Sequence, residues 1–222
     1  MIGLARLVGG ARTKFNRMLH FPATEKNKGP ILEVLKKALP QDREGLALEV
    51  ASGSGSHVTH FAPHFPRLTW LPTEIEDRNL QSISAFIQHT KVTNVKEPVI
   101  LDVTTDPRGW GGGLGEGSLT VILNANMIHI SPWDTAVGLF AGANYLLKSG
   151  GYLFIYGPFA IHGSLTPESN VKFDQYLKSQ DCRWGVRDID DLEKLAQTNR
   201  LKLHQMVDMP ANNKILIFVK ES

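Results

Sequence analysis

The fold of this 222-residue chain is decided by the stretch Leu48-Glu49-Val50-Ala51-Ser52-Gly53-Ser54-Gly55. The apolar run from Leu46 to Val50 predicts a short buried strand, and the small residues after it predict a turn. Gly53 and Gly55 give the backbone freedom there and remove the side chains that would keep a ligand away. Ser56 to Ala62 predicts a helix, so ligands are expected at the carboxyl end of the strand, beside the first N–H groups of that helix.

Glu49 separates the two cofactor classes that use such a turn. Dinucleotide-binding turns follow G-x-G-x-x-G with a small third residue, but Val58 occupies that position here. The pattern Glu49-x-x-x-Gly53-x-Gly55 instead resembles the first motif of class I methyltransferases that use S-adenosylmethionine (SAM). A carboxylate there suits a cationic cofactor, directly or by fixing the loop, whereas a pyrophosphate is repelled by a nearby anion. The alternative is a glycine turn with a solvated Glu49.

The composition indicates one domain with a small-molecule or protein partner. A chain of this length with 42% hydrophobic residues suits a single buried core. Its 24 basic and 22 acidic side chains leave a charge of +2, which gives no nucleic-acid footprint. The single Cys182 excludes an intrachain disulfide and a cysteine-based metal cluster, and no metal site is predicted. No apolar run approaches a membrane span, so we expect a soluble, cytoplasmic protein.

The first 23 residues differ from the rest of the chain because they carry no acidic residue. Their basic residues are Arg6, Arg12, Lys14 and Arg17. This composition resembles a mitochondrial presequence, and it also fits an unstructured leader. We therefore divide the chain into a basic leader, 1–23, and a single domain, 24–222, with the mitochondrial matrix as the alternative location.

Strands and helices are predicted to alternate through the domain. Pro30 fits the first position of a leading helix, and Ser131, Pro132 and Asp134 fit a capping box for a helix that runs to Lys148. The other predicted strands are Leu68–Leu71, Pro98–Val103, Leu119–Leu123 and Tyr152–Tyr156, the other helices are Glu168–Ser179 and Asp188–Asn199, and a terminal hairpin joins Leu201–Val207 to Ile215–Val219. Together these elements predict a mostly parallel Rossmann-like sheet of seven strands with an antiparallel C-terminal strand and helices on both faces.

Candidate cofactor residues follow the ends of the predicted strands. Glu74 either binds the two hydroxyls of a ribose or favours the start of the next helix. Asp102 either meets the adenine amino group, as the methyltransferase resemblance implies, or begins a turn. Asn27 either closes over the cofactor or is a solvated residue near the helix start. The full predicted cofactor set is Asn27, Glu49, Ala51, Gly53, Gly55, Glu74, Asp102 and Asn124.

The segment Asn124–Ile130 is expected to lie between the cofactor and the methyl acceptor. His129 is the one titratable residue in it, and it is either a proton acceptor or a hydrogen-bonded packing residue. Arg187 either binds a substrate carboxylate or pairs with a surface Asp. The predicted acceptor-binding residues are Met127, Tyr156, Arg187 and Asn212.

Several segments, in order along the chain, are similar to the family of methyltransferase-like protein 26. They are Glu25–Leu32, Leu48–Gly55, Leu101–Val103, Tyr156–Pro158, Gly185–Asp188 and Met209–Lys214. The resemblance runs from Ala23 to the end and implies a class I methyltransferase fold with SAM as cofactor and an unidentified acceptor. The basic leader departs from the short amino terminus of that family. The alternatives are a SAM-binding regulatory or scaffold protein and a nucleotide-dependent oxidoreductase, which Val58 and Glu49 disfavour.

Overall fold

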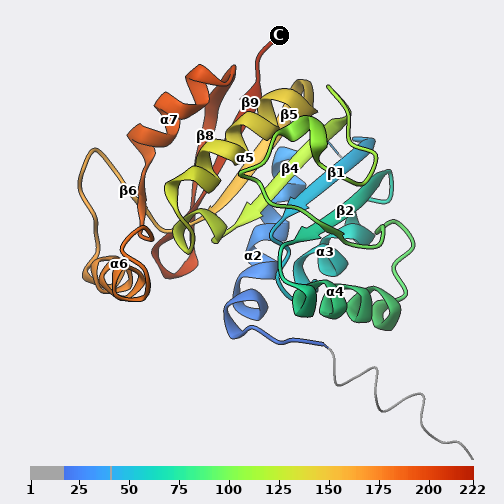
Figure 1. Ribbon diagram of the computed structural model, residues 1–222, viewed down its shortest axis with the longest axis horizontal. Coiled ribbons are helices and arrows are strands. Elements are labelled where there is room, and N and C mark those ends of the chain that lie inside the picture. The colour runs from blue at the N-terminus through green and yellow to red at the C-terminus, as the bar shows by residue number, and fades with distance from the viewer. Residues whose placement is uncertain (1–17, 41) are drawn as a thin grey trace, which may run out of the picture.

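The computed structural model describes residues 18–40 and 42–222, which form a central seven-stranded sheet with helices around it (Figure 1). The strand order is β3-β2-β1-β4-β5-β9-β8. The first strand, β1, pairs in parallel with β2 and β4, whereas β9 runs antiparallel to both of its neighbours, so the predicted sheet is confirmed. The strands are β1 (Gly45–Val50), β2 (Leu68–Glu74), β3 (Val99–Ile100), β4 (Leu119–Ala125), β5 (Leu147–Gly157), β8 (Leu201–Met209) and β9 (Asn213–Lys220), and β6 (Phe159–Ala160) and β7 (Arg187–Asp188) form a separate pair.

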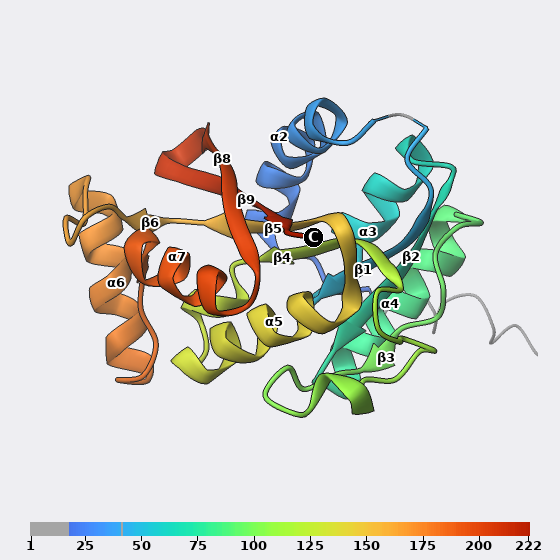
Figure 2. The same cartoon turned by 90° about the horizontal axis from the view of Figure 1, so that it is seen from above.

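Helices cover both faces of the sheet, as Figure 2 shows for α2 and α5 on its opposite sides. They are α2 (Pro22–Ala38), α3 (Ser56–Phe61), α4 (Asp77–Thr90), α5 (Trp133–Leu146), α6 (Glu168–Gln180) and α7 (Ile189–Thr198). In Figure 1, α6 lies out beyond the edge of the sheet. No helix in the described part of the chain combines the length and the apolar character that a membrane crossing requires.

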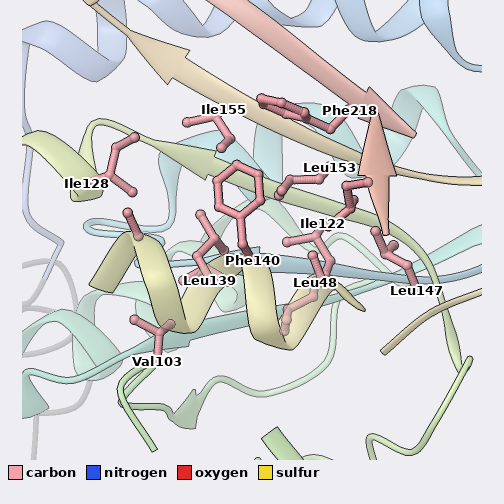
Figure 3. Packing of buried hydrophobic residues seen from close by; sticks show 14 of the residues in the cluster. Leu48, Val103, Ile122, Ile128, Leu139, Phe140, Leu147, Leu153, Ile155 and Phe218 are labelled. Carbon is pink, nitrogen blue, oxygen red and sulfur yellow. The ribbon is translucent and has the colours of Figure 1, made fainter. Parts of the chain in front are cut away.

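Two hydrophobic cores lie on opposite faces of the sheet because successive strand side chains point to opposite sides. Ala47 and Phe154 pack in the core under α2 and α3, whereas Leu48 and Leu153 pack in the core under α5 and α7. Figure 3 shows Phe140 of α5 pointing from its helix into this second core. Strands buried on both faces form continuous apolar runs, which explains the run that precedes Gly53.

The turn after β1 depends on left-handed backbone at three positions. The φ angles of Ala51, Gly53 and Gly55 are +56°, +58° and +92°. Glycine adopts this region freely, whereas it costs an alanine about 1–2 kcal/mol. A Cβ at Gly55 would also lie 2.8 Å from the Cα of Ile83. Gly55 therefore allows α3 to start against α4, and the turn is held in one shape.

Two predicted helix starts are corrected. The first helix begins at Pro22, which takes the favoured first position, and Pro30 lies inside it. Ser131 does not cap α5, because its hydroxyl is hydrogen-bonded to the Met127 carbonyl (2.5 Å) and to the Thr135 hydroxyl (2.6 Å). The cap position of α5 is Pro132.

Residues 18–23, which the sequence analysis placed in the leader, belong to the folded domain. The backbone N–H of Leu19 donates to the hydroxyl of Ser82 (2.8 Å), and the ring of His20 contacts the edge of Phe86 with centroids 5.5 Å apart. The rest of the basic leader, 1–17, lies outside the described residues.

Candidate functional site

A cleft of about 720 Å³ lies at the carboxyl ends of β1, β2 and β4, and we call it the first cleft. The turn after β1 borders it, and Phe21, Ala23 and Thr24 cross beside it at the start of α2. The structure brings several predicted residues together here, namely Ala51, Gly53, Glu74, Asp102 and Met127. Its other walls come from residues 74–76, 101–103, 125–127 and 130–132, from His57 and Thr135, and from Asp181, Arg183 and Trp184 before β7.

Glu74 ties the end of β2 to the turn after β1. Its Oε1 accepts a hydrogen bond from the N–H of Gly53 (2.9 Å), and its Oε2 accepts one from the N–H of Ile75 (2.8 Å). Each carboxylate oxygen has two lone-pair directions, so each can accept one further hydrogen bond. The buried carboxylate can therefore receive both hydroxyls of a diol while it holds the turn in place.

Glu49 lies behind the turn and does not line the first cleft, so of its two predicted roles the structure does not show the direct one. Its carboxyl is 2% exposed, and neither oxygen has a hydrogen-bond partner among the described residues. Burial raises the pKa of Glu49 to about 8 and lowers the pKa of His57 to about 4. His57 Nδ1 lies 3.8 Å from Glu49 Oε1, and these shifts make the two groups a neutral pair at pH 7. A cation bound in the first cleft, on the other side of the turn, would favour the ionised form of the Glu49 carboxyl.

A buried polar chain continues from His57 to α2 and β5. His57 Nε2 lies 2.7 Å from Asn27 Oδ1, so the ring nitrogen is the donor in this hydrogen bond. Asn27 also hydrogen-bonds the Tyr156 hydroxyl, whose pKa burial raises. Asn27 is buried and faces His57, so it is not the solvated residue of one alternative, and it does not line the first cleft as the other alternative expected.

Two other predicted cofactor residues support the first cleft from outside it. Asn124 is fully buried, and its Nδ2 donates to the carbonyl of Val50 (3.0 Å), which joins β4 to β1. Gly55 packs against α4 and lines neither cleft. Asn126, two residues after Asn124, lines the first cleft instead.

A second cleft of about 480 Å³ adjoins the first, and the two share Ala23, Asn126 and Ile130. It lies between α2, the end of β5, α6 and the turn from β8 to β9. Asn27 and Tyr156 line it. Its other lining residues are Lys26, Pro30, Pro158, Ser169, Asn170, Phe173, Pro210, Ala211 and Asn213. The second cleft therefore has apolar walls with amide groups between them, and it opens toward the first.

His129 does not reach either cleft, so the structure corrects its predicted catalytic position. Its ring is fully buried, and its edge contacts Phe159 with centroids 5.0 Å apart. Burial lowers the pKa of His129 to about 3. The short turn Met127–His129 directs the ring inward, where a Cβ on Gly157 would lie 2.4 Å from Nε2. This is the packing role, although neither ring nitrogen has a hydrogen-bond partner among the described residues.

Two predicted acceptor-binding residues also have structural roles. The Arg187 guanidinium donates to the carbonyls of Ile128 (2.8 Å) and Ser131 (2.7 Å), so it holds the segment after β4; it lines neither cleft and forms no ion pair with an Asp among the described residues. Asn212 has left-handed backbone (φ +61°) and lines neither cleft. Its side chain donates to the Ser169 hydroxyl (3.3 Å), which joins the β8–β9 turn to α6.

Sequence reasoning missed Phe21, Asn126 and Ile130. Phe21 was missed because it lies in the stretch assigned to the basic leader, although Pro22 directly after it favours the start of a helix. Asn126 follows the end of β4 and has left-handed backbone (φ +65°), a conformation that asparagine tolerates, so it starts the turn at the edge of the first cleft. Ile130 ends the segment that was expected to lie between cofactor and acceptor, but nothing singled out its side chain, which is 46% exposed at the junction of the clefts.

Comparisons with known proteins agree with this architecture. The family model described as "Protein of unknown function (DUF938)" matches residues 18–220. The chain is similar to an O-methyltransferase family protein from Burkholderia thailandensis, with a TM-score of 0.75 and 16% identity over 90% of this chain and 58% of that one. It is also similar to an O-methyltransferase family 2 protein from Planctomyces limnophilus DSM 3776 described in complex with apigenin (0.72, 18%, covering 93% and 61%).

A third similar structure is the S-adenosylmethionine-dependent methyltransferase SibL in its apo form, with a TM-score of 0.69 and 14% identity over 90% of this chain and 56% of that one. The chain thus spans 56% to 61% of the length of these proteins. At these identities the likeness shows the fold, which is the Rossmann-like class I methyltransferase fold.

Proposed function

The chain belongs to the family described as proteins of unknown function (DUF938), and we propose that it is a SAM-dependent methyltransferase acting on a small-molecule or protein acceptor. The observation that carries this proposal is the pair of clefts that meet at Ala23, Asn126 and Ile130. Two adjoining sites are what a reaction between two bound molecules requires, because holding both in line supplies much of the rate.

The first cleft fits SAM by its donor and acceptor groups. The two oxygens of Glu74 suit the ribose hydroxyls, and Asp102 suits the adenine amino group. Ala51 and Gly53 offer backbone beside the cleft, and the buried Glu49 behind them suits a cationic amino acid group. When bound, SAM supplies a methyl group activated by its sulfonium. The residues of this chain bind and orient it.

The second cleft is the proposed acceptor site. Tyr156 and Asn27 form part of its wall, and Met127 lies on the side of the first cleft. With His129 buried away from both clefts, catalysis by this chain rests on positioning the acceptor. We also propose, on the segments quoted above, that the chain is related to methyltransferase-like protein 26.

A second candidate function is a SAM-binding regulatory or scaffold protein. The distance of His129 from the clefts favours it, because a binding protein needs no proton acceptor. Thermal shift with SAM, S-adenosylhomocysteine and NAD(H) tests the cofactor, since a ligand that binds only the native state raises the melting temperature. Stabilisation by SAM but not by NAD(H) is the expected result. A shift with NAD(H) alone would favour the oxidoreductase.

A further inference from the structure

The junction of the two clefts offers no proton acceptor. Its three residues, Ala23, Asn126 and Ile130, do not titrate. Of the described residues that line the second cleft, the ionisable ones are Lys26 and Tyr156. Lys26 carries an ammonium group, which donates hydrogen bonds and accepts none. Burial raises the pKa of Tyr156 and so keeps its hydroxyl protonated, which means that it does not accept the proton of an acceptor either.

None of the ionisable groups of the first cleft lines the second cleft, and most of them already have a hydrogen-bond or ion-pair partner. His57 Nε2 faces Asn27, and both oxygens of Glu74 accept backbone N–H groups. Asp102 Oδ1 accepts from the backbone N–H (2.9 Å) and hydroxyl (2.7 Å) of Thr104. The Asp181 carboxylate pairs with the Arg183 guanidinium (2.7 Å), and exposed Glu76 borders the first cleft only. The sequence outside the described residues, 1–17 and Gln41, contains no Asp, Glu, His, Cys or Tyr.

The walls of the second cleft indicate an apolar acceptor body. Ile130 and Phe173 expose 46% and 36% of their surface, and both line this cleft. Large exposed apolar side chains that gather at one place mark a binding surface. Lys26 is exposed and forms no ion pair or hydrogen bond with the described residues. The second cleft therefore combines apolar walls with one cation that has no partner among those residues.

We propose, resting on the proposed function, that the acceptor is a small apolar or aromatic molecule whose nucleophile ionises by itself near neutral pH, a thiol above all. The thiolate attacks the methyl carbon of SAM and forms a new S–CH₃ bond. The bond between that carbon and the sulfonium breaks, and its electron pair stays on the cofactor sulfur, which becomes the neutral thioether of S-adenosylhomocysteine. The thiol loses its proton to solvent beforehand, so no enzyme group takes it. Lys26 attracts the anion to the second cleft.

The test uses two thiols and their oxygen counterparts as probes. Full-length protein and SAM are incubated with thiophenol, benzyl mercaptan, phenol or benzyl alcohol, and S-adenosylhomocysteine is measured. We expect turnover of the thiols and little of the alcohols at pH 7. Below the pKa of each thiol, its methylation rate should rise about tenfold per pH unit, because the thiolate is the reacting form. The pH at which the rate stops rising, the break in the profile, should equal the pKa of the thiol and therefore differ between the two thiols. A break at the same pH for both thiols would reveal an enzyme base and overturn the proposal.

A matched pair of variants tests the role of the cation. Lys26→Gln should lower kcat/KM for thiophenol about two- to fivefold, the scale of an exposed charge contact. Lys37→Gln, about 16 Å further along α2 by helix rise, should leave it unchanged. Equal kcat/KM values for the two variants would show that Lys26 does not contribute to acceptor binding.

Calorimetric titration of SAM distinguishes a failure of the proposed acceptor class from a failure of the proposed function. If the protein binds SAM but turns over neither thiol, or prefers phenol or benzyl alcohol, the acceptor class proposed here is overturned. If the protein does not bind SAM, the proposed function itself fails.

Discussion

Replacing Gly53 by valine is expected to abolish SAM binding while the sheet stays folded. Gly53 lies in the turn after β1 with φ +58°, and its N–H donates to Glu74. A Cβ at this position would be 3.5 Å from the Phe21 ring, an ordinary contact distance. The substitution therefore meets no backbone clash, but the two methyl groups of valine would fill the space between the turn and Phe21.

The stability cost of Gly53→Val comes mainly from left-handed backbone. For a residue with a side chain this conformation costs about 1–2 kcal/mol, and a branched residue is at the upper end. In a protein of this size, about 2 kcal/mol lowers the melting temperature by about 4–8 °C. Loss of the cofactor space should lower SAM affinity at least about a hundredfold, which is about 3 kcal/mol of binding free energy.

Gly150→Val is the matched control. Gly150 also has left-handed backbone (φ +70°), a Cβ there would have no neighbour within 4 Å, and the residue lines neither cleft. Both variants should lose similar stability in thermal unfolding, and calorimetry should find SAM affinity lost only in Gly53→Val. If folded Gly53→Val binds SAM with the affinity of Gly150→Val, the turn is not part of the cofactor site.

Burial holds the pKa of His57 at about 4 in the folded chain, against an ordinary value of 6.5. Between these two values the unfolded chain binds more protons than the folded chain. This group therefore lowers the free energy of unfolding by about 3 kcal/mol as the pH drops from 6.5 to 4. The Glu49 carboxyl, whose pKa burial raises to about 8, changes stability in the opposite sense over most of this range, so the His57 effect is measured as the difference between wild type and His57→Gln in denaturant unfolding. Wild type should lose stability relative to the variant as the pH falls from 6.5 to 4, and a difference that does not change with pH would contradict the assignment. Phe21→Ala should weaken SAM binding about five- to tenfold through lost apolar contact, whereas the control Tyr176→Ala on α6 should leave it unchanged. If calorimetry finds equal SAM affinities for the two variants, Phe21 does not contact the cofactor. His129→Gln should cost about 1–3 kcal/mol of stability and leave SAM affinity unchanged, and a stable variant with abolished turnover would restore a catalytic role. A reporter fused to residues 1–22 should enter mitochondria if the leader is a presequence, and a diffuse reporter in cell imaging would refute that.

The fold was predictable because its signals are local. The apolar run of β1 ends at a turn that requires Gly55, and alternating strands and helices have few topological solutions. Asp188 was correctly identified at the start of α7, where its side chain accepts from the N–H of Asp190 (2.9 Å). Each of these signals lies within a few residues, so packing elsewhere does not change it.

The site was less predictable because it depends on which way a side chain points. β1 and β4 are buried on both faces, so alternation does not tell which face of Glu49 or Asn124 meets a ligand. Both lie behind the first cleft, whereas Glu74 lines it. The ring of His129 lies against Gly157, a contact between distant parts of the sequence that no local pattern predicts.

Transfer of a labelled methyl group tests the central claim most directly. The protein is incubated with SAM labelled at the methyl carbon and a cell extract, and labelled products are separated by mass. The proposed function predicts a labelled acceptor that wild type and Gly150→Val produce and Gly53→Val does not. SAM binding without any labelled product would contradict the proposed methyltransferase activity and favour the second candidate, a SAM-binding regulatory protein. Equal labelling by Gly53→Val would contradict the assignment of the first cleft.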